Sequence, residues 1–191
     1  MPQMSITVSE VTDPARAAQV AAVAAATFPL ACPPHSRPED IAEFIRGNLD
    51  TASFQAHISA AESQVLVATT DAGDPDGATV VGYALLHHRA PADADVAVAV
   101  AARPASEVSK MYVLPGHHAR GRADAPSALL MRAALDHSRA RGSAVAWLGV
   151  NQENERAQRF YAKMGFHRVG TKTFDLNGSV EHDYVLAQPL G

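Results

Sequence analysis

The stretch from residue 107 to residue 150 constrains the fold most, because its pattern predicts a strand, a helix and a second strand. Residues 107–114 are expected to form a strand, and residues 144–150 are an apolar run typical of a buried strand. Between them, Pro126 to Arg141 places apolar residues on one helical face. Two strands joined through a helix run parallel, whereas antiparallel neighbours need only a short turn. The sequence therefore predicts a parallel crossover within a β-sheet.

The flanking segments predict a mixed sheet around this crossover. Two apolar runs separated by turn-forming residues 71–78 predict an antiparallel hairpin. The other expected elements are strands at 5–11, 64–70, 79–87, 166–170, 171–176 and 183–186, and helices at 14–27, 38–48, 51–61 and 154–164. Together they predict a single α/β domain over residues 1–191, with a central mixed sheet (α+β) flanked by helices.

Two segments have weaker patterns. Residues 29–38 contain four prolines, so we expect the first helix to end before Pro29 and a long loop to follow. Residues 89–105 are expected to form a connection, with an extra strand as an option at 95–100.

Composition excludes several classes of protein. A single cysteine, Cys32, cannot form a disulfide framework, and no apolar run reaches the length of a membrane span. The net charge of −4 disfavours a general nucleic-acid binder. No phosphate-binding G-x-x-x-x-G-K-[ST], no G-x-G-x-x-G and no Cys/His cluster with metal-ligand spacing is present, so we expect neither a dinucleotide nor a metal. The N-terminus lacks a secretion signal, and a cytoplasmic protein is therefore expected.

The most informative motifs lie in residues 107–166. A strand ending at Pro115 is followed by a loop of basic and small residues, then by a helix that opens at Pro126. Backbone N–H groups at such a helix start form a ready anion site. One strand later the chain reads N-E-R-A-x-x-F-Y-x-x-x-G-F.

This ordered set resembles the GNAT superfamily of acetyl-CoA-dependent N-acetyltransferases. The further matches M-Y-V-L-P, W-L-G-V-N-Q-x-N-E-R-A, F-x-x-V-G and F-x-L-N-G-x-x-x-x-D-Y are similar to bacterial spermidine/spermine acetyltransferases of the PaiA type. The resemblance covers nearly the whole chain and is strongest at 107–186. It implies the GNAT acyl-CoA N-acyltransferase fold, with helices at 14–61 on the substrate side and a CoA-binding core at 107–166.

The resemblance also implies a reaction. An acetyl group would pass from acetyl-CoA to a primary amine of a small molecule, polyamine-like or other, by direct attack in a ternary complex. Tyr161 matches the tyrosine that protonates the departing CoA sulfur, and Asn154 the residue that bonds the pantetheine arm. Backbone groups of Val113 and Met111 are expected to bind the thioester carbonyl and the pantetheine, on a strand that splays from its neighbour. A homodimer through the C-terminal strands is also implied.

The loop that would hold the CoA phosphates departs from the family pattern. The motif falls on residues 122–127, where Ala125 replaces the middle glycine and Ser127 stands last. Alanine keeps its N–H, so the loop can still bind phosphate if this position needs no positive φ. Asp124 adds an unfavourable charge unless it points away or is paired. The residues expected to bind the cofactor are thus Met111, Val113, Arg120, Gly121, Arg122, Ala123, Ala125, Ser127, Asn154 and Tyr161.

Each assignment has a structural alternative. Tyr161 also fits a packed tyrosine, and Asn154 a simple helix N-cap. Glu107 is a candidate general base, acting through water, or an edge carboxylate. Other groups with two interpretations are the base candidates His87, His88 and Asp183, the phosphate candidates His117, His118 and Lys163, the free thiol Cys32, and the acids Glu39, Asp40, Glu43, Asp50, Glu62 and Glu181, which suit either a polyamine or an ordinary surface.

Two functions follow from these observations. The first is an acetyltransferase acting on a small amine or, as an alternative, on a protein or peptide amine. The second is a catalytically weak or inactive module of the same fold that binds CoA for regulation. The altered loop favours the second, and the presence of both Asn154 and Tyr161 favours the first.

Overall fold

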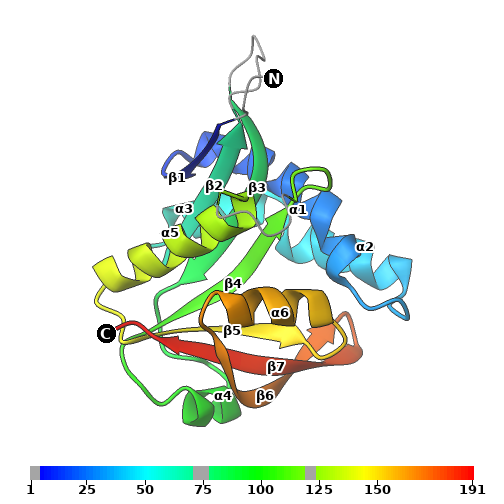
Figure 1. Cartoon of the computed structure of the whole chain (residues 1–191). Helices are drawn as coiled ribbons and strands as arrows, with labels where there is room; N and C mark the ends of the chain where they lie inside the picture. The colour runs from blue at the N-terminus through cyan, green and yellow to red at the C-terminus, as the bar shows by residue number, and fades with distance from the viewer. Residues whose placement is uncertain (1–4, 71–77, 119–123) are drawn as a thin grey trace.

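A computed structural model describes residues 5–70, 78–118 and 124–191, and a twisted sheet forms its centre (Figure 1). The sheet has seven strands in the order β1-β2-β3-β4-β5-β7-β6. The strands are β1 (Ile6–Glu10), β2 (Ser63–Thr70), β3 (Thr79–His87), β4 (Ala105–Val113), β5 (Val145–Asn151), β6 (His167–Leu176) and β7 (Ser179–Pro189). Among the described strands, β4 and β5 are the parallel pair, and the other neighbours are antiparallel. The predicted crossover and the mixed sheet are confirmed.

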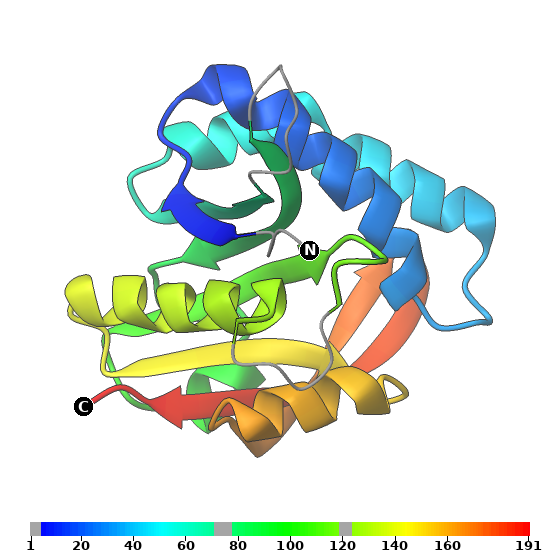
Figure 2. The ribbon, with the colours of Figure 1, turned by 45° about the horizontal axis from the view of Figure 1, so that its top comes forward.

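Helices cover both faces of this sheet (Figure 2). On one face, α5 (Pro126–Ala140) and α6 (Glu155–Lys163) pack over a core that includes Leu66, Leu130 and Leu148. The opposite face is covered by α1 (Ala17–Ala31), α2 (Pro38–Asn48) and α3 (Thr51–Ser59). A short helix, α4 (Ala94–Ala99), packs on β6 and closes a third apolar cluster.

The first helix passes through a proline, so the prediction that it ends before Pro29 is wrong. Helix α1 continues to Ala31, and the remaining loop is shorter than expected. Pro29 cannot bond the carbonyl of Ala25, but Ala25 lies on the exposed side of the helix where water can reach that carbonyl. The buried ring of Phe28 stacks on Phe44 with centroids 4.8 Å apart, and this packing holds the last turn in place.

Other elements also differ from the expected ones. The optional strand at 95–100 is wrong, because this segment is helix α4. The side chain of Asp93 caps that helix by accepting from the backbone N–H groups of Asp95 and Val96. A 3₁₀ turn, Pro14–Arg16, precedes α1.

The C-terminal hairpin is longer than expected. A single strand, β6, with a register shift between Arg168 and Gly170, replaces the two expected at 166–170 and 171–176. β7 extends well beyond the expected 183–186. The turn between the strands is Asn177-Gly178, where both residues have positive φ, as a type I′ turn requires.

Candidate active site

Strands β4 and β5 separate after three residue pairs, and this separation opens the sheet. The last pair is Glu107 with Trp147, after which β4 continues beside β3 alone. Figure 2 shows the two strands diverging. The backbone of β4 beyond Glu107 therefore has an edge that no strand of the described chain covers, which agrees with the expected splay.

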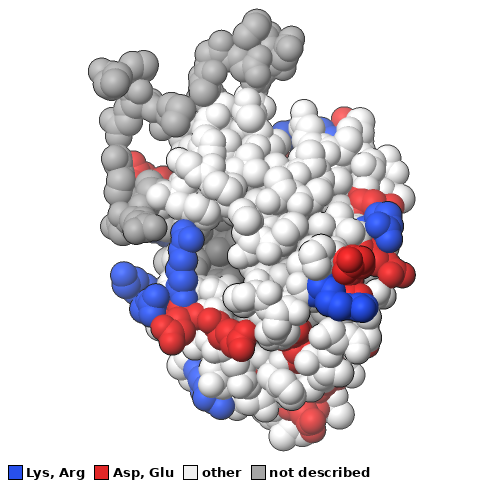
Figure 3. All heavy atoms as spheres, turned by 90° about the vertical axis from the view of Figure 1, so that its right-hand side faces the viewer, with Lys and Arg blue, Asp and Glu red and all other residues white. Residues whose placement is uncertain are grey.

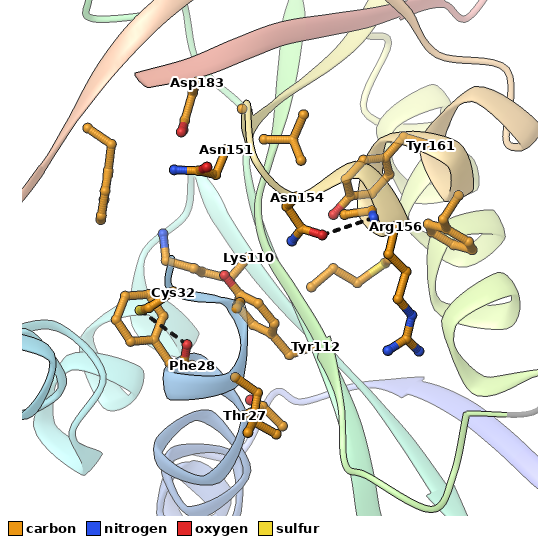
Figure 4. A pocket seen from close by; sticks show the side chains of 18 of the residues that line it. Thr27, Phe28, Cys32, Lys110, Tyr112, Asn151, Asn154, Arg156, Tyr161 and Asp183 are labelled. Atoms are coloured by element: carbon orange, nitrogen blue, oxygen red, sulfur yellow. Dashed lines mark hydrogen bonds between the residues drawn. The ribbon is translucent and has the colours of Figure 1, made fainter. Parts of the chain in front are cut away.

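A cavity of about 380 Å³ lies at this opening. Its lining comes from the C-terminal end of α1, from β4 and β5, from the start of α5, and from α6, β6 and β7. Figure 4 shows side chains from α1 and from α6 on either side of β4. The cavity thus communicates with both faces of the sheet.

A β-bulge in β4 decides which side chains face which half of the cavity. Glu107 pairs with His87, and Lys110 pairs with Leu85, so three residues on β4 match two on β3. In a regular strand, residues three apart point to opposite faces, but the bulge brings Glu107 and Lys110 to the same face. This is the α1 face, because Leu85 belongs to the α1 cluster.

The opposite face of β4 points toward α5 and α6. Val113 belongs to the core beneath these helices, and Met111 packs against it. Both residues line the cavity, as do Ser127, Asn154 and Tyr161. The structure therefore gathers five of the expected cofactor-binding residues on one face, here called the α6 half of the cavity.

Ala125 has a backbone conformation that does not require glycine. It is the N-cap residue of α5, with φ −62° and ψ 139°, and it is buried. Its carbonyl accepts the backbone N–H of Leu129 at 3.0 Å. Because φ is negative, alanine fits this position without strain. The expected cofactor residues Arg120, Gly121, Arg122 and Ala123 lie outside the described residues.

Tyr161 is both a packed aromatic side chain and part of the cavity wall. Its ring makes edge contacts with Phe160 and Phe166, with centroids 5.4 and 6.1 Å apart, and its side chain also lines the cavity. Burial raises the pKa of Tyr161 to about 12, so the phenol keeps its proton at neutral pH.

Asn154 is both a helix N-cap and part of the cavity wall. Its Oδ1 caps α6 by accepting the N–H of Ala157 at 3.1 Å, and the residue lines the cavity (Figure 4). The cap uses only the oxygen, which leaves the two amide N–H donors for a ligand.

The other side, here called the α1 half of the cavity, carries charged groups. Lys172 Nζ lies 3.8 Å from Asp183 Oδ2, and Glu107 and Lys110 come from β4. Burial raises the pKa of Glu107 and of Asp183, and it lowers the pKa of Lys110. At its edge, Glu181 is held by His35, whose Nε2 lies 2.9 Å from Glu181 Oε1.

Sequence reasoning missed both lysines. The position of Lys110 depends on the bulge, which has no signal in the sequence. The position of Lys172 could have been predicted from the sequence, because the Asn177-Gly178 turn fixes the hairpin register that places Lys172 opposite Asp183.

Several other candidates do not line the cavity, among them His87, His88, His117 and Lys163. His87 Nδ1 lies 3.0 Å from Ser63 Oγ, and His88 Nδ1 lies 2.7 Å from Ser106 Oγ. Burial lowers the pKa of both imidazoles to about 4. His118, Asp183 and Cys32 do line it, and burial raises the pKa of the Cys32 thiol to about 11, which keeps it protonated.

Most of the acids suggested for a polyamine are engaged elsewhere. Arg37 binds Asp40, Asn177 donates to Glu43, and Arg89 pairs with Glu62. Asp50 caps α3 by accepting from Ser53. Of the six suggested acids, Glu181 alone lines the cavity.

The comparisons with known proteins agree with this arrangement. The model of the acetyltransferase (GNAT) family matches residues 25–166. Proteins named as uncharacterized N-acetyltransferases from Mycobacterium bovis and Mycobacterium tuberculosis are 44% identical over 172 residues, which cover 90% of this chain and 96% of theirs.

Solved structures share the fold. A PaiA N-acetyltransferase from Thermoplasma acidophilum, in complex with coenzyme A, has a TM-score of 0.68 at 19% identity, covering 97% of this chain and 99% of its own. A GCN5-related N-acetyltransferase from Rhodopseudomonas palustris has the same TM-score at 20% identity, covering 99% and 98%. The family match and the mycobacterial relatives show that this chain belongs to the GNAT family of acetyl-CoA-dependent acetyltransferases.

Proposed function

We propose that the protein transfers an acetyl group from acetyl-CoA to the primary amine of a small molecule, by direct attack in a ternary complex. The observation that carries this proposal is the cavity through the sheet, which Tyr161 reaches from one face and Glu107 from the other. An acid and a base on opposite sides of one opening suit a reaction in which donor and acceptor enter from opposite faces.

The α6 half fits acetyl-CoA. The free edge of β4 offers backbone groups of Met111 and Val113, and Asn154 offers amide donors. The start of α5 offers backbone N–H groups near Ser127 for phosphate, and Ala125 precedes them with a negative φ that alanine adopts without strain. When bound, acetyl-CoA supplies a thioester, an activated acyl donor.

The proton transfers are assigned to the two residues at the opening. Glu107 takes a proton from the acceptor ammonium, directly or through water, and burial raises its pKa and so strengthens it as a base. Tyr161 donates its phenolic proton to the sulfur that leaves as the C–S bond breaks, and it regains a proton from the nitrogen that has formed the new C–N bond. Asp183, also in the α1 half, is the alternative base.

The second candidate function, a CoA-binding module without catalysis, is favoured by the departures at residues 124, 125 and 127. The negative φ of Ala125 weakens that argument at one of the three positions. Acetylation of a protein or peptide amine is the remaining alternative, and a polyamine is one member of the small-amine class.

Two assays test the proposal. Thermal shift with acetyl-CoA measures cofactor binding, since a ligand at a hundred times its Kd adds about 2.7 kcal/mol of apparent stability. A thiol-release assay over amines and peptide N-termini measures turnover. Binding with release in the presence of an amine supports the enzyme; binding without release from any amine supports the regulatory module.

We further propose a cytoplasmic location and a homodimer. The location is supported by the single cysteine, Cys32, which does not form a disulfide. The dimer is supported by β6, whose outer edge no described strand covers. Light scattering after size exclusion tests the dimer. Within the described residues, no helix has the length and apolar character that crossing a membrane requires.

A further inference from the structure

The α1 half of the cavity contains two lysine ammonium groups beside the candidate base. We propose that the acceptor amine also carries a carboxylate, as an amino acid does, and that Lys110 and Lys172 bind this carboxylate. The proposal rests on the proposed function and narrows its acceptor class.

Lys110 has unused donor capacity inside the cavity. Its Nζ donates to the carbonyl of Ser109 at 3.2 Å, and no described carboxylate lies within 4.0 Å of it. An ammonium group has three donors, and taking it out of water without an anion is costly. Figure 4 shows its amine pointing toward the side of the cavity where Asn151 and Asp183 lie. An anionic group of a ligand at this point would supply the missing partner.

Lys172 approaches the same region from β6. Its side chain is 18% exposed, and that of Asp183 is 13% exposed. The aliphatic part of Lys172 crosses Gly149, where a Cβ added to the glycine would come within 2.4 Å of Lys172 Cε. At 3.8 Å the contact with Asp183 is longer than a hydrogen bond, which leaves Lys172 donors for a second acceptor.

The charges of this half suit a zwitterion. Lys110, Lys172 and the carboxylates Glu107 and Asp183 all line the cavity, with Glu181, whose carboxylate contacts His35, at its edge. An amino acid that places its ammonium beside Glu107 and its carboxylate beside the lysines meets an opposite charge at each end. A polyamine would bring a second ammonium toward two lysines, where like charges repel.

The outer surface gives a polyamine little support. The face that carries α2 and the turn between β6 and β7 shows basic and acidic side chains together beside a hollow (Figure 3). Glu181, the suggested acid at the cavity, is engaged by His35. On this face, the described residues form no purely acidic surface that would attract a polycation.

The test compares amino acids with the amines left when their α-carboxylate is removed. The pairs are phenylalanine and phenethylamine, tyrosine and tyramine, histidine and histamine, methionine and 3-(methylthio)propylamine, and arginine and agmatine, with spermidine as the polyamine. Thiol release gives kcat/KM for each, and thermal shift in the presence of CoA gives binding without turnover. We expect at least one amino acid to exceed its partner by about tenfold or more in either measurement.

Variants then assign the preference to the lysines. Lys110→Met and Lys172→Met should reduce the preferred pair's ratio toward one, mainly by raising KM for the amino acid. Arg46→Met, which removes an exposed charge on α2 outside the cavity, should leave the ratio unchanged. Circular dichroism and the acetyl-CoA thermal shift confirm that each variant is folded, and Lys110→Gln, which removes the charge but keeps a polar end, tests the site if Lys110→Met does not fold.

The outcomes separate the two proposals. Turnover of spermidine or of decarboxylated amines at least as fast as the amino acids overturns the carboxylate site and leaves the proposed function standing. The carboxylate site is also overturned, and the proposed function still stands, if the preference for the amino acid over its decarboxylated partner is unchanged in both lysine variants. Carboxylate-dependent binding without thiol release supports the site and contradicts the proposed function. If no amino acid binds or reacts better than its partner, the carboxylate site is wrong.

Discussion

The ammonium of Lys172 lies 3.8 Å from the carboxylate of Asp183, and the end of the lysine side chain lies against Gly149. Three strands, β5, β6 and β7, each contribute one of these residues. The absence of a side chain at Gly149 is what leaves room for the lysine at the base of the cavity.

Gly149→Ala should therefore displace Lys172. The added Cβ would lie 2.4 Å from Cε, which is the movable end of a flexible chain, so the lysine should shift and the fold survive. We expect KM for the acceptor to rise about tenfold, as loss of a charge-assisted contact predicts, with little change in the Kd of acetyl-CoA. Steady-state kinetics and a CoA titration check this; an unchanged acceptor KM would contradict it.

Tyr161→Phe should lower kcat by about a hundredfold or more, because a positioned general acid contributes at least that much. The ring contacts with Phe160 and Phe166 remain in the variant, so stability and CoA affinity should change little. Tyr184→Phe, which removes a hydroxyl outside the cavity, is the matched control. Full activity of Tyr161→Phe would exclude the phenol as the acid.

Glu107→Gln should remove the acidic limb of the pH profile of kcat/KM. Burial raises the pKa of Glu107, so activity should rise with pH as this carboxyl loses its proton, beginning above the usual range for glutamate. The variant should be about a hundredfold slower. Asp183→Asn, measured in parallel, distinguishes the two candidates: the base is the residue whose replacement abolishes the limb.

Asn154→Asp should separate the cap from the ligand contact. Aspartate keeps an oxygen for the N–H of Ala157, so the free energy of unfolding should stay within about 0.5 kcal/mol of the wild type. It loses both amide donors and adds a negative charge, so the Kd of acetyl-CoA should rise. Asn154→Ala should lose the cap as well, at about 1 kcal/mol. If Asn154→Asp binds acetyl-CoA normally, the residue is only a cap.

His87 and His88 should make stability depend on pH. Burial lowers the pKa of each to about 4 in the folded chain, against 6.5 for an ordinary histidine. Between these values the unfolded chain binds more protons, so both residues make the free energy of unfolding rise with pH from 4 to 6.5 and level off above. Glu107 and Asp183, with raised pKa values, act in the opposite direction.

Because these effects oppose one another, the contribution of His87 is measured by comparing the pH dependence of unfolding in a variant and in the wild type. His87→Gln should show a smaller increase in the free energy of unfolding between pH 4.5 and 6.5 than the wild type, by urea denaturation across that window. Equal slopes in the two proteins would mean that His87 is not held neutral in the fold.

The elements near the cavity illustrate what local sequence determines. The crossover through α5 followed from apolar periodicity, and the Asn177-Gly178 turn from residues that adopt positive φ. The end of α1 did not follow, because burial of Phe28 outweighs the cost of Pro29, and that burial depends on Phe44 from α2.

By itself, the sequence determined the mixed sheet and placed Glu107, Asn154 and Tyr161 on the correct elements, because strand and helix patterns act over a few residues. The tertiary structure decided which side chains share a cavity. The bulge in β4 turned Glu107 and Lys110 to one face, and the pairing of β6 with β7 brought Lys172 to Asp183. These depend on strand register, which neighbouring strands fix together and no single segment encodes.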